Sequence, residues 1–187
     1  MSLEVLSTGA ALGTFIVIAA TAIAAVIQLR HLRASNQLQG LLNVLARAED
    51  ANFNEWIDRS RHIVAENMPD SNYRRRIIDG TFDRTDNPWL NLANSYEWMG
   101  SLIRQGLIPE APFMDVHGGR IMGAWRLIEE IIAIRRRQIG PRVWENFEYI
   151  FMRAASYDSR HPHGVYPKTT PRAKLNDKWL AADTAAS

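Results

Sequence analysis

The stretch LSTGAALGTFIVIAATAIAAVIQL, from Leu6 to Leu29, decides how the rest of the chain is interpreted. It belongs to a run of 25 positions without a charged residue, between Glu4 and Arg30. A helix of roughly 20 apolar residues crosses a bilayer core of about 30 Å. The sequence therefore predicts a membrane-spanning helix near the N-terminus. The competing interpretations are a cleaved secretory signal and a buried hydrophobic helix.

The charges that flank this run favour a retained anchor over a signal. A signal peptide has positive charge before a shorter apolar core, whereas here Arg30, His31 and Arg33 follow the run and Glu4 precedes it. Positive charge marks the cytoplasmic side of a span. We therefore expect the N-terminus outside and everything after Arg30 in the cytoplasm.

Small residues recur at four-residue spacing within the run. Gly9 and Gly13 form one pair, and Ala20 and Ala24 form another. Such a face lets a second helix approach closely in lipid, although small residues are also common in membrane helices in general. The run contains no ionisable side chain, so we expect it to anchor or pack rather than to relay protons or ligate a haem.

The composition of the 187 residues narrows the possible chemistry. The chain has no cysteine, which excludes disulfides, thiolate nucleophiles, iron–sulfur clusters and cysteine-based zinc sites. Residues 51–152 contain 13 basic and 14 acidic residues, and residues 153–187 contain six and three. The central region is thus nearly neutral, and because it lacks a sustained basic face we expect no nucleic-acid partner.

Apolar residues at helical spacing, with no strict alternation, predict an all-α protein: one transmembrane helix, a cytoplasmic bundle of four or five helices and an extended tail. The expected divisions are an anchor (1–30), a juxtamembrane helix (31–50), the bundle (51–155) and a basic tail (156–187).

Turn and cap residues give the expected limits of the bundle helices. The first helix runs from Ala51 to Glu66 after an N-cap at Asp50, and the second starts in TDNPWL and ends at Gly106. The third starts at Pro109, is interrupted at Gly118 and Gly119, and ends at Gly140. The last runs from Pro141 to Ala155. We expect the stretch with Arg74, Arg75 and Arg76 to connect the first two.

Four segments resemble a bacterial family, the domain of unknown function 4760: IQLRHLR at 27–33, LANSYEWMGSLIRQGLI at 92–108, the helix with Trp125 and the Arg135–Arg137 run, and VWENFEYI at 143–150. The resemblance implies a membrane helix, a basic juxtamembrane helix and a helical domain. It implies the inner membrane of a bacterium and no particular activity.

Candidate catalytic and metal-binding residues are few. Asp115 and His117 could pair as an orienting carboxylate and a base, and the Gly118–Arg120 segment could hold an anion at a helix start. His161 and His163 are close in sequence but lack an evident third ligand. Phosphate-loop, dinucleotide, zincin and hydrolase motifs are absent from the sequence. We therefore expect no enzyme, cofactor or metal site.

The binding residues that the sequence suggests fall into two groups. Lipid head groups or another anion are expected at Arg30, Arg33, Arg74, Arg75 and Arg76. Partner proteins are expected at Trp98, Tyr166, Trp179 and Leu180, since tryptophan is common at binding hot spots.

Three functions remain open from sequence. The first is a non-catalytic accessory or scaffolding subunit of a respiratory, photosynthetic, transport or defence complex, which contacts membrane lipids and other subunits. The second is a membrane-tethered sensor of an anionic ligand or lipid. The third is an enzyme that uses Asp115 and His117. The sequence names no small-molecule ligand.

Overall fold

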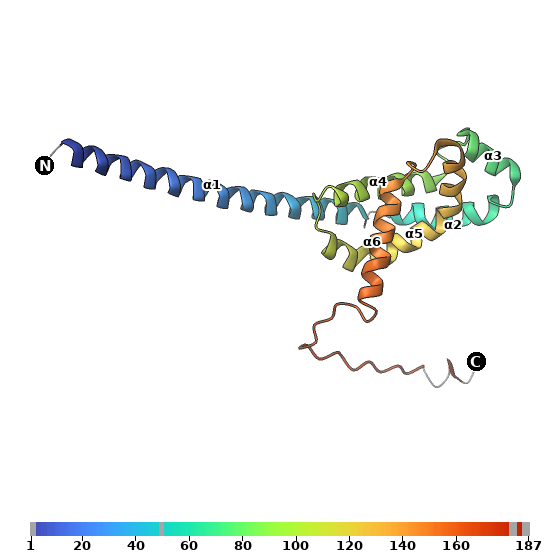
Figure 1. Ribbon diagram of the computed structural model, residues 1–187. Helices are drawn as coiled ribbons and strands as arrows, with labels where there is room; N and C mark the ends of the chain where they lie inside the picture. Colours follow the sequence, from blue (N-terminus) through green and yellow to red (C-terminus); the bar gives the residue numbers. More distant parts are fainter. Residues whose placement is uncertain (1–2, 49–50, 180–182, 185–187) are drawn as a thin grey trace.

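The computed structural model describes residues 3–48, 51–179 and 183–184 (Figure 1). Within these ranges the chain forms six α-helices and no strand, which confirms the all-α prediction. The helices are α1 (Leu3–Ala48), α2 (Ala51–Asn67), α3 (Ser71–Asp79), α4 (Pro88–Arg104), α5 (Glu110–Ile139) and α6 (Glu145–Arg160). Five of them follow α1, at the upper limit of the expected bundle. The N-cap expected at Asp50 lies outside the described residues.

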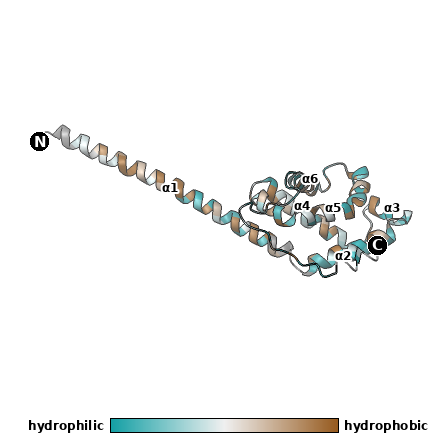
Figure 2. Cartoon of the chain, turned by 90° about the horizontal axis from the view of Figure 1, so that it is seen from below, coloured by the Kyte–Doolittle hydropathy of each residue, from teal (hydrophilic) through white to brown (hydrophobic). Residues whose placement is uncertain are grey.

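Helix α1 is a single rod of 46 residues, about 70 Å long at a rise of 1.5 Å per residue. It continues through Arg30 and through Gly40 without a break, so the expected anchor and juxtamembrane helix are one element. Figure 2 shows mostly hydrophobic residues in the middle of the helix and a mixture of hydrophilic and hydrophobic ones toward the bundle. Among the described residues, α1 is the one helix long and apolar enough to cross a membrane.

Aromatic and branched side chains of α4, α5 and α6 form the core, because each helix buries one apolar stripe. Helix α6 packs on both α4 and α5, while α2 packs on α4 and α3 packs on α5. Helix α4 has apolar residues at helical spacing that are all buried: Trp89, Leu92, Ala93, Tyr96, Met99 and Ile103. This helix therefore buries one apolar face in the core.

Helix α3 is absent from the sequence prediction, which made this stretch a connection. It has nine residues and buries Tyr73 and Ile77, which lie one turn apart. Asp70 caps its start by accepting a hydrogen bond from the backbone of Asn72, and Gly80 ends it in the left-handed conformation. Caps at both ends stabilise a helix too short and too polar to show an apolar period.

Two further boundaries differ from the prediction. Helix α5 runs through Gly118 and Gly119 without the expected interruption, since packing on α6 outweighs the roughly 1 kcal/mol by which each glycine disfavours a helix. Helix α6 begins at Glu145 and ends at Arg160, so the tail begins later than expected. Residues 162–179 form an exposed segment without helix that leaves the bundle after α6 (Figure 1).

Candidate functional site

The tightest polar junction of the bundle joins α4 to the start of α6. Trp144, the N-cap position of α6, has φ 51° and makes no side-chain capping bond. The carboxylate of Glu97 on α4 takes over that role, because it accepts hydrogen bonds from the backbone N–H of Asn146 (2.9 Å) and of Phe147 (3.0 Å). It also accepts one from the Asn146 side chain (2.7 Å). A negative charge at a helix N-terminus is stabilising.

Gly100, one turn after Glu97, lets the two helices approach. A methyl group added at Gly100 would overlap the carbonyl oxygen of Asn146 and lie 3.1 Å from the Asn146 Cβ. The indole N–H of Trp144 donates to Asn94 Oδ1 on α4 (2.9 Å), a second bond across the same crossing. We call the set Asn94, Glu97, Gly100, Trp144 and Asn146 the α4–α6 junction.

The α4–α6 junction unites two of the segments on which the family resemblance rests, 92–108 and 143–150. Their aromatic residues stack next to it: the rings of Tyr96 and Phe147 are 4.7 Å apart and nearly parallel. Burial raises the pKa of Tyr96 well above its ordinary value, so its phenol stays neutral at physiological pH. These motifs hold the bundle together and supply no acid, base or nucleophile at an open site.

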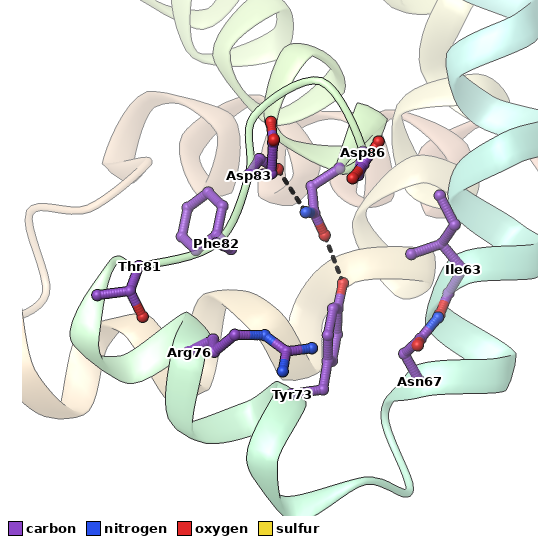
Figure 3. A pocket seen from close by; sticks show the side chains of 9 residues that line it. Ile63, Asn67, Tyr73, Arg76, Thr81, Phe82, Asp83 and Asp86 are labelled. Carbon is purple, nitrogen blue, oxygen red and sulfur yellow. Dashed lines mark hydrogen bonds between the residues drawn. The ribbon is translucent and has the colours of Figure 1, made fainter.

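A cavity of about 460 Å³ lies beside α3 (Figure 3). Its inner wall is a buried hydrogen-bonded set. Tyr73 donates its hydroxyl hydrogen to Asn87 Oδ1 (2.7 Å), and the Trp89 indole N–H lies 2.9 Å from the same oxygen. The amide of Asn87 in turn donates to the backbone oxygen of Asp83. Each partner restrains the next, so this wall is rigid.

The triple-arginine run does not converge on this cavity. Arg76 lines it and lies over the Tyr73 ring at 5.7 Å. Arg74 turns back to the carbonyls of Met68 and Pro69, where it closes the α2–α3 turn, and Arg75 is exposed on α3. The carboxylates of Asp83 and Asp86 also line the cavity, so its charge is mixed and does not favour an anion.

Asp115 and His117 lie on α5 but point in different directions. Residues two apart on a helix are about 200° apart around its axis. His117 is buried, 5.1 Å from the Phe113 ring. Asp115 is exposed and lies beside Tyr157 of α6, whose pKa is raised by desolvation and by this carboxylate. The structure does not bring this candidate acid–base pair together in one cleft.

The other candidate residues for anion or metal binding, Gly118–Arg120 and His161, lie within α5 or at the end of α6 and contact neighbouring residues of the fold. Gly118, Gly119 and Arg120 are in the middle of α5 rather than at a helix start, and Arg120 donates to Asn54 of α2 (2.8 Å). The possibility of an anion site at a helix start there is therefore wrong. His161 bonds through Nδ1 to the carbonyl of Tyr157 (2.9 Å) at the end of α6. In the described part of the chain, no three histidine or carboxylate side chains converge as a metal site would require.

The small residues of α1 share one open face. At 100° per residue, Gly9, Gly13, Ala20 and Ala24 fall within an arc of about 60°. A Cβ atom built on either glycine would meet nothing within 4 Å, and both alanines are exposed. The most apolar part of this helix is 0% buried inside the chain. The face is thus available to another helix or to lipid.

A groove of about 610 Å³ separates the second half of α1 from the turn between α4 and α5. The turn is fixed to α1 by one hydrogen bond, from the Gln37 side chain to the carbonyl of Gly106 (3.0 Å). Leu107, next in the turn, is 52% exposed. Sequence reasoning assigned Gly106 as a helix stop and missed the groove, since no local signal marks the residues that meet α1.

The residues expected to contact partner proteins lie far apart in sequence and are exposed where described. Trp98 borders a shallow hollow formed with Trp56 and Asn91, and Trp98 itself is 45% exposed. In the tail, Tyr166 has the Arg172 guanidinium 4.7 Å from its ring, and Trp179 is exposed. Leu180 lies outside the described residues. Their role in binding stays a prediction.

A comparison with protein-family models matches residues 15–153 to a domain of unknown function, DUF4760. The match begins inside the apolar run and ends within α6. It therefore includes most of α1 as well as the bundle and excludes the tail. No curated protein and no solved structure matches the chain.

Proposed function

The chain belongs to the DUF4760 family, and from this premise we propose that it is a non-catalytic, single-pass membrane protein that serves as an accessory or scaffolding subunit of a larger membrane assembly. The observation that carries the proposal is the exposure of α1. The most apolar part of this helix is 0% buried in the chain itself.

Membrane insertion accounts for this exposure. Nine large apolar side chains between Leu12 and Leu29 are exposed on α1. At about 0.3–0.6 kcal/mol each on an insertion scale, they favour the bilayer by roughly 3–5 kcal/mol. An exposed apolar surface of this length in water would instead favour aggregation. The anchor thus supports a position in a membrane.

The orientation follows from charge. Arg30, His31 and Arg33 come directly after the apolar run, which favours a cytoplasmic bundle and an outer N-terminus in the inner membrane of a bacterium. The bundle itself is held by the α4–α6 junction, and Asp115 and His117 do not meet in one cleft. A binding role therefore accounts for more of the surface than a catalytic one.

Two surfaces support contact with other subunits. The open face with Gly9 and Gly13 suits close approach of a second membrane helix. Outside the membrane, Trp98 and the tail residues Tyr166 and Trp179 offer exposed aromatic side chains of the kind enriched at binding hot spots.

The test is extraction of the tagged full chain from native membranes in mild detergent, followed by size-exclusion chromatography and identification of co-eluting proteins. We expect a defined complex that Gly13→Leu weakens and Phe15→Leu leaves intact. Phe15 is a matched control because it is exposed at nearly the same depth and lies about 200° from Gly13 around the helix. A monomer from the unaltered chain would refute the proposal.

A further inference from the structure

The groove between α1 and the α4–α5 turn starts where the apolar run ends. Leu29, the last residue before Arg30, lines its outer end, and Leu32 and Arg33 follow along α1. Gln37 and Gly40 close the inner end: Gln37 bonds to the turn, and a Cβ on Gly40 would lie 3.5 Å from the carbonyl oxygen of Leu107. The groove is therefore a continuation of the surface of the anchor.

Its depth follows from the helix rise. At 1.5 Å per residue, Arg33 lies about 6 Å and Gln37 about 12 Å beyond Leu29 along the axis. The polar layer on each side of a hydrocarbon core is roughly 5–8 Å thick. With Arg30 at the boundary, Leu32 and Arg33 lie within the head-group layer, and the α4–α5 turn, which contacts α1 at Gln37 and Gly40, lies beyond its outer edge. This step rests on the proposed function, since it requires α1 to span the membrane.

The side chains in the groove suit the same layer. Leu29, Leu32 and Leu107 are exposed apolar groups. The polar groups that line the groove are one guanidinium, from Arg33, and the amides of Asn36, Gln37 and Gln105, and no carboxylate is among its described lining residues. A guanidinium donates well to a phosphate, amides can donate to ester carbonyls, and leucines can contact the upper part of an acyl chain.

We propose that this groove binds a phospholipid of the leaflet next to Arg30, with the upper acyl chain against Leu29 and Leu32, the phosphate at Arg33, and the rest of the polar head group extending toward Gln37 and Leu107. The α4–α5 turn is then a second membrane contact of the protein. It holds the bundle against the bilayer at a fixed side of α1, in addition to the anchor.

A protein helix in the same groove is the main competing occupant. Depth and charge favour lipid, because the groove begins at the end of the apolar run and has a positive and no negative lining side chain. An anionic phospholipid surface attracts basic residues near it. The experiment below separates the two occupants, since it uses purified chain and lipid alone.

The absence of cysteine allows site-specific labelling of the full chain. Single substitutions Leu107→Cys, Ile139→Cys and Val17→Cys receive an environment-sensitive nitrobenzoxadiazole dye, and each protein is reconstituted into phosphatidylcholine vesicles that contain phosphatidylglycerol. Ile139 is the matched control: it is as exposed as Leu107, 54% against 52%. It lies at the other end of α5, about 45 Å along that helix.

We expect the dye at position 107 to emit at shorter wavelength and to be quenched by lipids with a spin label near the head group, and the dye at 139 to behave as in water. Position 17 reports the anchor and should be quenched by spin labels deep in the acyl chain. If 17 is quenched while 107 behaves like 139, the inference is overturned and the anchor stands. If 17 is not quenched, the proposed function itself fails.

The role of Arg33 is tested in the Leu107→Cys background. Arg33→Gln should reduce quenching at position 107, whereas Arg137→Gln, a change of an exposed arginine near the far end of α5, should leave it unchanged. Circular dichroism checks that both variants are folded. Equal quenching in the two variants would overturn the assignment of a phosphate to Arg33.

Discussion

Gly100→Ala is the sharpest test of the α4–α6 junction. The added methyl group would overlap the carbonyl oxygen of Asn146. The added methyl group would lie on α4, and the carbonyl oxygen lies in the first turn of α6. Because both are fixed in helices, the strain is relieved by moving α6 away from α4. That movement lengthens the two backbone hydrogen bonds that Glu97 accepts.

The expected magnitude combines three effects. Overpacking in a core destabilises by about 1–3 kcal/mol, and loss of a helix cap adds about 1 kcal/mol. The better helix propensity of alanine returns about 1 kcal/mol. The net loss of unfolding free energy is about 1–3 kcal/mol, which for a chain of this size lowers Tm by about 2–12 °C.

Gly119→Ala is the matched control, because Gly119 is also in the middle of a helix but a Cβ there would meet nothing within 4 Å. This variant should gain about 0.5–1 kcal/mol. Thermal unfolding of the full chain in detergent, followed by circular dichroism at 222 nm, measures both. Equal Tm values for Gly100→Ala and the unaltered chain would refute the argument that the junction requires a glycine.

Three further predictions concern the anchor, the wall of the α3 cavity and the core. Ile18→Arg places a charge within the span at about 2.5–3.5 kcal/mol, so a membrane-insertion assay should show a large loss of inserted chain while Ile18→Leu inserts normally. Asn87→Ala leaves the Tyr73 hydroxyl and the Trp89 indole N–H without their shared acceptor. The expected loss is about 1–3 kcal/mol in urea unfolding, and a loss no larger than that of an exposed polar residue would contradict it. Because burial raises the pKa of Tyr96 above its ordinary value of about 10, the unfolded chain loses this proton first and stability falls as the pH rises above about 10. Tyr96→Phe should reduce that slope in unfolding measurements at alkaline pH, and an unchanged slope would exclude Tyr96 as its source.

The parts of the fold that the sequence predicts are those with a repeated local signal. The apolar run before Arg30 and the stripe of α4 each show many apolar residues at regular spacing, and both are confirmed as helices. Pro88 at the first turn of α4 and Gly106 after its end are backbone preferences that operate without tertiary contacts. Such features can be read from the chain alone.

The parts that the sequence mispredicts depend on contacts between distant residues. Gly118 and Gly119 indicate a break only if the helix is considered alone, and α5 remains continuous because it packs on α6. Helix α3 has too few apolar residues to show a period and is stabilised by its caps. Glu97 caps α6 from a position about 50 residues earlier in the chain. No local sequence pattern predicts such a contact.

The candidate sites divide in the same way. The open face of α1 follows from helical spacing, whereas Asp115 and His117 looked like a pair because they are two residues apart in sequence, although helical geometry separates their side chains. The groove at Leu107 escaped prediction, because it forms where two segments more than 60 residues apart meet, as the bond from Gln37 to Gly106 shows.

The continuity of α1 sets an angular register between the membrane and the bundle. One unbroken helix joins the face of Gly9 and Gly13 to the contacts at Gln37 and Gly40. The orientation of that face around the helix axis therefore fixes the side of the axis on which the bundle lies. One residue inserted near Ser35 would swing the bundle by about 100° around the anchor, whereas seven would raise it by about 10 Å and turn it by only about 20°. A neighbouring subunit that binds both the membrane face of α1 and the bundle should therefore still bind after a seven-residue insertion in α1, but not after a one-residue insertion.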